Sequence, residues 1–284
     1  DLEESEKTVG CQAFVEAGYE SQLKSVTLLK NKGNVLPMKR GLKVYVPERH
    51  IRSYLDFMSM PTGEQDIVPP GKNAAEEYFT VVENPEDADA ALCFMESPIS
   101  VGYDPEDRKA GGNGYVPITL QYCPYKAVDG RAESIAGGDF LETFRNRSYK
   151  DKWNTAANEA DLDNVINMRK IMGDKPVIAI VSLKNPMVMA EFEPYADAVL
   201  VEYGVYPKAV LDILTGKFEP EGLLPLQIPK DMNTVESQKE DVAFDMECYT
   251  DSEGHCYDFG YGMNFTGVIS DERTARYVKT DKRK

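Results

Sequence analysis

The apolar residues of this chain gather into short continuous runs. Five runs stand out, at residues 43–46, 88–95, 176–183, 198–201 and 226–228. A strand whose apolar residues run on without alternating is buried on both faces, which is typical of a parallel sheet covered by helices. We therefore expect five strands of this kind.

Amphipathic segments lie between these runs and predict helices. Residues 13–32 repeat apolar side chains at helical spacing and end at Gly33-Asn34, which tolerate positive φ. Residues 161–172 carry acids in the first turn and bases in the last, as the helix dipole favours. Residues 186–192 and 207–214 each begin with proline. Strands that alternate with helices predict an α/β fold with a mainly parallel sheet.

Residues 97–158 interrupt this alternation. They are rich in glycine, proline, tyrosine and charged residues and show little periodicity. A segment of this length without periodicity is usually functional or disordered, and its aromatic content together with Ile118-Thr119-Leu120 favours order. We expect a long structured insertion at the carboxyl edge of the sheet, where open α/β sheets bind ligands.

Length and charge narrow the possible functions. The chain has 284 residues, enough for one large domain, and its formal charge is −16. That charge disfavours a nucleic-acid or anionic-membrane partner, and no apolar run approaches the roughly 20 residues that span a bilayer. The start has neither an initiator Met nor a signal-peptide pattern. We expect the chain to have been cut from a longer polypeptide.

Histidine and cysteine are too few for most metal or triad chemistry. The two histidines, His50 and His255, lie in polar surroundings that predict solvated loops. The five cysteines contain no CxxC pair, so a structural zinc site is not expected. Cys248 and Cys256 flank a predicted turn and are close enough in sequence to pair in an oxidising compartment, with reduced thiols as the simpler expectation.

The glycine pattern also argues against a bound cofactor. A nucleotide-binding α/β domain needs a glycine-rich turn between a strand and a helix. The first strand is followed by Pro47-Glu48-Arg49-His50, and no helix begins after the glycine-rich run 111–114. We expect no cofactor and no metal, and a stand-alone nucleotide- or flavin-binding protein is the weakest alternative.

Carboxylates and tyrosines in the insertion point instead to sugars. Two carboxyl groups that flank a glycosidic oxygen can hydrolyse it by acid and base catalysis, and tyrosine rings pack on sugar faces. A solvated acidic surface is the competing interpretation in a chain with 48 acidic residues. The carboxylates of the insertion that could do this chemistry are Asp104, Glu106, Asp107, Glu133, Asp139 and Glu142.

Five sequence motifs follow one another along the chain. They are Ser25-Val26-Thr27-Leu28-Leu29-Lys30-Asn31 with Val35-Leu36-Pro37, the stretch from Lys175-Pro176-Val177-Ile178 to Leu183-Lys184-Asn185-Pro186, Ala196-Asp197-Ala198-Val199-Leu200, the run 214–225 that holds Pro220-Glu221-Gly222-Leu223-Leu224-Pro225, and Tyr257-Asp258-Phe259-Gly260-Tyr261-Gly262-Met263. In this order they resemble the C-terminal domain of glycoside hydrolase family three, the β-glucosidase family. The resemblance runs from about residue 25 to residue 269.

The resemblance implies a three-layer α/β sandwich with a six-stranded, mainly parallel sheet. It divides the chain into a leading helix and linker (1–40), the sandwich domain (41–269) with its insertion (97–158), and a polar tail (270–284). It further implies a retaining β-glycosidase that removes terminal β-linked sugars. In such an enzyme a TIM-like barrel, N-terminal to this domain, carries the nucleophilic aspartate, and this domain supplies the acid/base. The isolated chain is then expected to be inactive. The family also implies a periplasmic or secreted protein.

Two departures from the family pattern limit the assignment of roles. Ser270-Asp271 is followed by Glu272, where the family's nucleophile motif has tryptophan, and lies at the wrong end of the chain, so we assign no nucleophile. In the acid/base segment, keeping Gly-Tyr-Asp in register puts Val101 at the catalytic position, whereas counting back from Arg108 puts Asp104 there. Glu106 is one gap away, and Glu133 lies later in the same insertion, so the resemblance leaves Asp104, Glu106 and Glu133 as alternative acid/base candidates. Tyr103, Tyr115 and Tyr122 are the candidates for packing against the sugar. A non-catalytic carbohydrate-binding or scaffold domain that has lost the acid/base is the alternative function.

Overall fold

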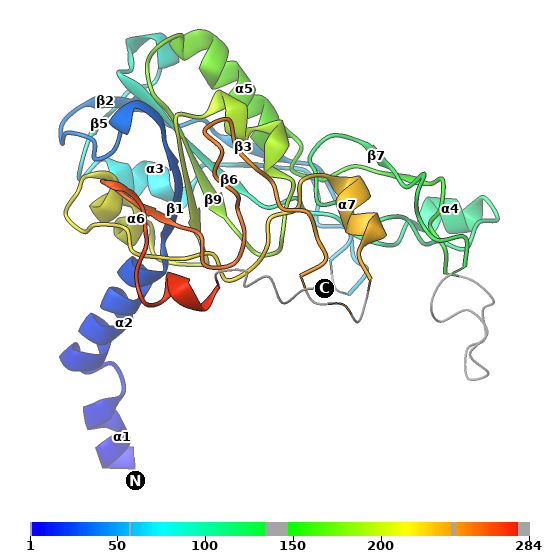
Figure 1. The fold of residues 1–284 in the computed structure, drawn as a ribbon, viewed down its shortest axis with the longest axis horizontal. Helices are drawn as coiled ribbons and strands as arrows, with labels where there is room; N and C mark the ends of the chain where they lie inside the picture. Colours follow the sequence, from blue (N-terminus) through cyan, green and yellow to red (C-terminus); the bar gives the residue numbers. More distant parts are fainter. Residues whose placement is uncertain (1, 57, 134–146, 240–241, 243, 278–284) are drawn as a thin grey trace.

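A computed structural model describes residues 2–56, 58–133, 147–239, 242 and 244–277. Within these residues an eight-stranded sheet has the strand order β12-β11-β1-β10-β9-β6-β2-β5 (Figure 1). Its strands are β1 (Thr27–Asn31), β2 (Lys43–Tyr45), β5 (Thr80–Val81), β6 (Ala90–Glu96), β9 (Val177–Ser182), β10 (Ala198–Glu202), β11 (Met263–Asn264) and β12 (Gly267–Val268). Two small hairpins lie outside it, β3 (Arg49–Ile51) with β4 (Gln65–Ile67) and β7 (Tyr125–Lys126) with β8 (Trp153–Asn154).

Helices cover both faces of the sheet, which confirms the predicted three-layer α/β fold. On one face, α5 (Ala160–Met172) packs over the central strands, and α3 (Pro70–Ala75) and α6 (Pro207–Leu214) lie on the other (Figure 1). The remaining helices are α1 (Leu2–Thr8), α2 (Gln12–Ser25), α4 (Pro105–Lys109) and α7 (Met232–Ser237). Short 3-10 turns are η1 (Lys32–Asn34), η2 (Pro85–Asp87), η3 (Met189–Glu191), η4 (Glu193–Tyr195) and η5 (Thr274–Arg276).

The continuous apolar runs predicted four of the five expected strands correctly. β2, β6, β9 and β10 coincide with them and are parallel to one another. Strands β6, β9 and β10 are buried on both faces, whereas in β2 only Val44 is buried. The fifth prediction, 226–228, was wrong, because only the adjacent Pro229 makes an isolated bridge, to Cys248. The sheet has eight strands, where the resemblance implied six. Strands β5, β11 and β12 are only two residues long, too short to leave a hydrophobic pattern in the sequence.

The helix predicted over 13–32 is half right. Helix α2 ends at Ser25, and the chain continues as strand β1, every residue of which is buried. Strand β1 runs antiparallel to both β10 and β11. Its apolar residues fit helical spacing as well as an all-buried strand, so the periodicity could not separate the two. Gly33 and Asn34 do take positive φ, but they end a strand and not a helix.

The segment 186–192 also differs from its prediction. In place of a helix that begins at Pro186, the segment forms the 3-10 turn η3, and a second turn, η4, follows it. The large residues Met189, in η3, and Phe192, between the two turns, are buried in the core beneath α5. The apolar pattern was therefore correct about burial and wrong about the type of helix.

Two glycines of the recognised motifs meet at the edge of the sheet. A Cβ atom on Gly222 would lie 2.4 Å from the carbonyl oxygen of Val26, at the start of β1. A Cβ atom on Gly262 would lie 2.3 Å from the carbonyl oxygen of Gly222. Because these neighbours are backbone atoms, only glycine fits at either position. The two motifs are thus parts of one packed junction beside β1.

A buried carboxylate fixes α2 to the body of the domain. Asp212 on α6 is 1% exposed and accepts hydrogen bonds from the hydroxyls of Tyr19 (2.8 Å) and Tyr78 (2.6 Å) and from Lys217 Nζ (2.8 Å). Burial alone would raise the pKa of Asp212, but the bonds from Lys217, Tyr78 and Tyr19 outweigh it, so the pKa lies below its usual range. Since Tyr19 belongs to α2, this carboxylate joins α2 to helix α6.

Asp212→Asn is expected to lower the free energy of unfolding by about 2 kcal/mol, because the amide loses the charge that three donors share. A carboxyl whose folded pKa is lowered stabilises the protein above its unfolded pKa of about 4 and loses that effect as the pH falls through the folded value. The difference between wild type and Asp212→Asn in urea unfolding should therefore shrink between pH 5 and the acid limit. Asp174→Asn, at an exposed aspartate, is the matched control.

Candidate functional site

The insertion extends from the carboxyl edge of the sheet, as expected. It leaves β6 at Ser97 and returns at Asn158, immediately before α5. Its described residues, 97–133 and 147–158, are ordered around α4 and the β7–β8 hairpin (Figure 1). It therefore projects a structured lobe from the sheet edge at which α/β folds bind ligands.

One asparagine joins the two ends of the insertion. The side chain of Asn158 is buried and accepts the Ile99 backbone N–H at 2.7 Å. Its amide donates to the carbonyl oxygen of Glu96 at 3.0 Å and to Asp161 Oδ2 at 2.9 Å. The backbone N–H of Ala157 also donates to the carbonyl of Ile99, at 2.8 Å. These hydrogen bonds join the first and last residues of the insertion at the base of the lobe.

A buried ion pair supports that closure. Arg49 donates through Nε and Nη2 to the two carboxylate oxygens of Asp161, at 2.8 and 2.7 Å. Asp161 is 1% exposed and also accepts the Glu96 backbone N–H at 3.2 Å. Burial alone would lower the pKa of Arg49, but the bonds and charge of Asp161 outweigh it and raise the pKa. Asp161, which the sequence marked only as a helix-dipole residue, is the centre of this anchor.

In the outer part of the lobe, the carboxylate of Asp107 is neutralised by Lys152. Asp107 accepts from Lys152 Nζ at 2.6 Å and from the Gly114 backbone N–H at 2.7 Å. Lys152, with the smaller contribution of Gly114, holds the pKa of Asp107 below its usual range. Asp107 is therefore paired with a cation and stays ionised.

The three acid/base candidates lie in different environments. Asp104 is the N-cap of α4, where its Oδ1 accepts the Glu106 backbone N–H at 2.8 Å. Glu106 is exposed and pairs with Lys109 at 2.6 Å. Glu133 is exposed and directly precedes residues 134–146, which lie outside the described part of the chain. Asp104 and Glu106 thus share α4, whereas Glu133 stands apart from them in the lobe.

Only two of the three tyrosines proposed for sugar packing reach the surface. The rings of Tyr103 and Tyr115 meet edge to face, with centroids 6.1 Å apart, and Tyr103 is 41% exposed. Tyr122 is fully buried, and its hydroxyl donates to the Glu96 carbonyl. The prediction of a sugar contact for Tyr122 was wrong, because this ring belongs to the core beneath the lobe.

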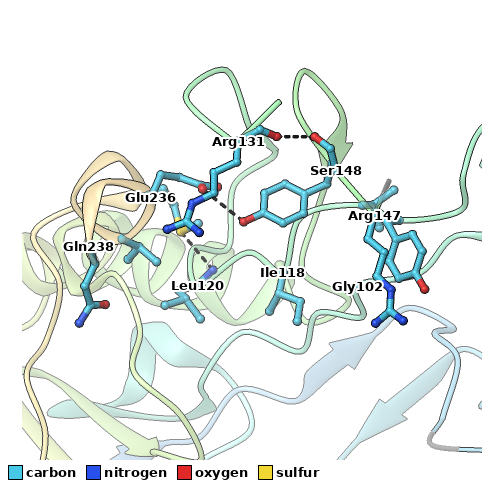
Figure 2. Close-up of a pocket in the computed structure, with 13 residues that line it drawn as sticks. Gly102, Ile118, Leu120, Arg131, Arg147, Ser148, Glu236 and Gln238 are labelled. Carbon is cyan, nitrogen blue, oxygen red and sulfur yellow. Dashed lines mark hydrogen bonds between the residues drawn. The ribbon is translucent and has the colours of Figure 1, made fainter. Parts of the chain in front are cut away.

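A cavity of about 520 Å³ lies between the lobe and α7 (Figure 2). Its floor is apolar, formed by Val116, Ile118, Leu120, Met232 and Val235. At one end Glu236, on α7, accepts hydrogen bonds from Tyr125 (3.0 Å) and Tyr149 (3.3 Å). Arg131 and Arg147 also line the cavity. It is a cleft with an aliphatic floor and charged groups at its margin.

Sequence reasoning missed α7 and therefore Glu236. The helix has a start signal, since Asp231 caps it by accepting the Thr234 backbone N–H at 2.8 Å. Its place beside the lobe depends on contacts far apart in sequence: the Leu120 backbone N–H lies 3.3 Å from Met232 Sδ. No local pattern reports such a contact, although the capping motif was available to predict the helix.

The histidines and cysteines occupy the following places. His50 lies between Asp66 (2.8 Å) and Glu64 (3.0 Å). The hydrogen bond that its ring N–H donates to the Asp66 carboxylate is the main cause of its raised pKa. Asp251, Glu253 and His255 bring three potential metal ligands within 4.8 Å, but Asp251 is already engaged by His255 and by the Tyr257 hydroxyl. Cys248 and Cys256 form no disulfide bond in the structure; Cys248 is buried and Cys256 exposed.

Comparison with known proteins places this architecture in a family. The profile of the glycosyl hydrolase family 3 C-terminal domain matches residues 26–265. Probable beta-glucosidase C of Aspergillus flavus is 29% identical over 268 residues, 93% of this chain and 31% of that protein. A periplasmic beta-glucosidase of Salmonella typhimurium is 22% identical over 276 residues, 87% of this chain and 34% of that protein.

Solved structures agree on the fold. Beta-glucosidase 3B from Thermotoga neapolitana, in complex with glucose, superposes with a TM-score of 0.51 at 15% identity, over 90% of this chain and 38% of that one. The chain spans about a third of the length of the curated relatives it matches. Among the described residues, no helix combines the length and apolar character needed to cross a membrane.

Asp161→Asn is expected to cost about 3 kcal/mol of unfolding free energy, since it leaves the largely buried Arg49 charge with only the Glu96 carboxylate, 3.8 Å away, to balance it. Asp163→Asn changes an exposed carboxylate in the same helical turn and should be nearly neutral. Urea unfolding measures both. Equal costs for the two variants would contradict the anchor.

Proposed function

We propose, because the chain belongs to glycosyl hydrolase family 3 as a C-terminal domain, that it completes the active site of a retaining β-glycosidase. The substrate is a terminal β-linked sugar, and the relatives named beta-glucosidase support that class. Retaining hydrolysis needs two carboxyl groups about 5–5.5 Å apart. In this proposal the insertion supplies the acid/base, and an N-terminal barrel of the same polypeptide supplies the nucleophile.

The observation that carries the proposal is the tied lobe at the carboxyl edge of the sheet. Asn158 and the Arg49–Asp161 pair hold its base, so a carboxylate on the lobe has a defined position relative to the domain. Catalytic groups must be held near the productive geometry, and a buried anchor provides that. A surface loop without such an anchor would not hold a catalytic carboxylate in a fixed position.

Among the carboxylates considered, we propose Glu133 as the acid/base. Asp104 is engaged as the N-cap of α4, and Glu106 is paired with Lys109, so both carboxylates already have structural partners. Glu133 is exposed on the lobe, where a second domain and its substrate could reach it.

A second candidate function is a carbohydrate-binding or scaffold domain without the acid/base. It is favoured by Val101, which holds the catalytic position when Gly102-Tyr103-Asp104 is kept in register. We further propose a periplasmic or secreted location, since two of the relatives are named as periplasmic enzymes.

Glu133→Gln, made in the polypeptide that includes the barrel, is expected to lower kcat by about 10²–10⁴-fold on substrates with poor leaving groups. Aryl glycosides with good leaving groups need little protonation and should lose far less. Asp104→Asn and Glu106→Gln are the matched comparisons on the same lobe. If all three variants keep normal turnover on poor leaving groups, none of these three carboxylates is the acid/base, and the binding function gains support.

The chain on its own is expected to show no turnover of aryl β-glycosides above the uncatalysed rate, because one of the two carboxyl groups lies on another domain. A continuous assay of released phenol measures this. Adding the separately produced barrel should restore activity if the two parts associate. Hydrolysis by the chain alone would contradict the shared active site.

A further inference from the structure

Three potential metal ligands meet in the turn 251–255, which leads into the motif 257–263. Asp251, Glu253 and His255 alternate along the chain, and the Asp251 backbone N–H donates to the His255 carbonyl at 3.0 Å. The backbone N–H groups of Glu253 and His255 both donate to Asp251 Oδ1, at 2.9 and 2.8 Å. Oδ1 of Asp251 therefore fixes the turn, and Oδ2 faces the His255 ring.

The Asp251 carboxylate and the His255 imidazole are spaced like two ligands of one ion. Asp251 Oδ2 lies 3.1 Å from His255 Nδ1, and one ligand atom of each of the three residues lies within 4.8 Å of the other two. Two donor atoms bound to zinc at about 2.0–2.1 Å stand roughly 3.3 Å apart in tetrahedral geometry. A zinc ion can thus replace the proton between Oδ2 and Nδ1 with little movement of either side chain.

Tyr257 orients the carboxylate from the protein side. Its hydroxyl is buried and donates to Asp251 Oδ2 at 3.2 Å. Hydrogen-bonded partners of this kind orient the carboxylates that bind metals. On the other side, Glu253 is exposed and the His255 side chain is 25% exposed, so an ion can enter the turn from solvent.

The surroundings of Asp251 lack a fixed positive charge. Its side chain is fully buried, and its ion-pair partner among the described residues is His255, which is a cation only when protonated. Glu193, a second buried carboxylate, is paired with Lys30. Burial, and then the charge of Asp251, raise the pKa of Tyr261, whose ring lies 5.8 Å from that of His255. Because a buried carboxylate needs a counter-charge, this negative field is a separate reason to expect a cation at the turn.

His50 shows that two acids beside a histidine are not sufficient. Its Nδ1 faces Asp66 at 2.8 Å, and its Nε2 faces Glu64 at 3.0 Å. The two ring nitrogens point away from each other, so these carboxylates cannot share one ion with the ring. At the turn 251–255 the ligand atoms converge, and His50 is therefore a matched control.

We propose that the turn 251–255 binds a zinc ion through Asp251 Oδ2, the His255 imidazole and a carboxylate oxygen of Glu253. Imidazole with carboxylates is a donor set that suits zinc, and three protein ligands leave a fourth position for water. The ion ties the turn to Tyr257 and stabilises the motif that follows. This departs from the expectation of no metal, and it does not depend on the proposed glycosidase function.

Calorimetric titration of the metal-free chain with zinc chloride tests the site. Glu253→Gln and His255→Ala should each weaken the tightest zinc-binding event about tenfold or more, because even partners that only orient a ligand are typically worth about 10–100-fold. His50→Ala should leave that event unchanged. Glu253 is exposed, so its variant is expected to fold normally. Wild-type affinity in both ligand variants, or no zinc binding by the wild-type chain, would overturn the proposal.

Cobalt as a spectroscopic probe separates this site from binding by a thiol. Cys256 is exposed and directly follows His255. A thiolate ligand gives Co²⁺ a strong charge-transfer band in the near ultraviolet, which nitrogen and oxygen ligands do not. The chain loaded with Co²⁺ should lack this band, and Cys256→Ser should keep the wild-type zinc affinity. A thiolate band that disappears in Cys256→Ser would overturn the assignment.

Thermal unfolding gives a second readout. An ion that binds the folded chain raises Tm with the logarithm of its concentration above Kd. Zinc should therefore raise the Tm of wild type and His50→Ala, and it should have little effect on Glu253→Gln. An equal rise in wild type and Glu253→Gln would place the ion elsewhere and overturn the proposal.

Discussion

The Arg49–Asp161 pair is the constraint on which the working edge of this domain depends. It brings together the β3 hairpin, the start of α5 and the end of β6, three elements far apart in the sequence. Asn158 extends the same network to the base of the lobe. Burying a guanidinium and a carboxylate costs free energy, and only their paired geometry offsets it. The bidentate Arg49–Asp161 ion pair, together with Asn158, therefore fixes the base of the lobe relative to the sheet.

The sequence predicted the centre of the fold well because the central strands are buried on both faces. Strands β6, β9 and β10 lie between two helical layers, so their apolar residues run continuously. Strand β1 was mistaken for helix because its all-buried pattern also fits helical spacing. The two-residue strands at the sheet edges exist through pairing with distant partners, and no local pattern can report such pairing.

The sequence predicted where the candidate site lies, but it predicted less well which residues form it. Glycine, proline and tyrosine marked residues 97–158 as an ordered insertion, but Tyr122 looked like its neighbours while lying in the core. Whether a tyrosine faces solvent depends on what packs above it. Glu236 was missed because α7 reaches the lobe only through the tertiary fold, where Tyr125, Ala127, Val188 and Met232 form a small core of their own. That second core makes the lobe and α7 one unit.

The junction of Gly222, Gly262 and β1 has a consequence for how the domain is made. Strand β1 lies near residue 30, yet its outer neighbour β11 lies at residues 263–264. During synthesis the edge of β1 must wait for more than two hundred further residues before its partner emerges. Contacts of such sequence separation form late and slowly. An apolar strand with an unpaired edge is also a template for aggregation. A nascent domain of this kind is most vulnerable just before its closing hairpin leaves the ribosome.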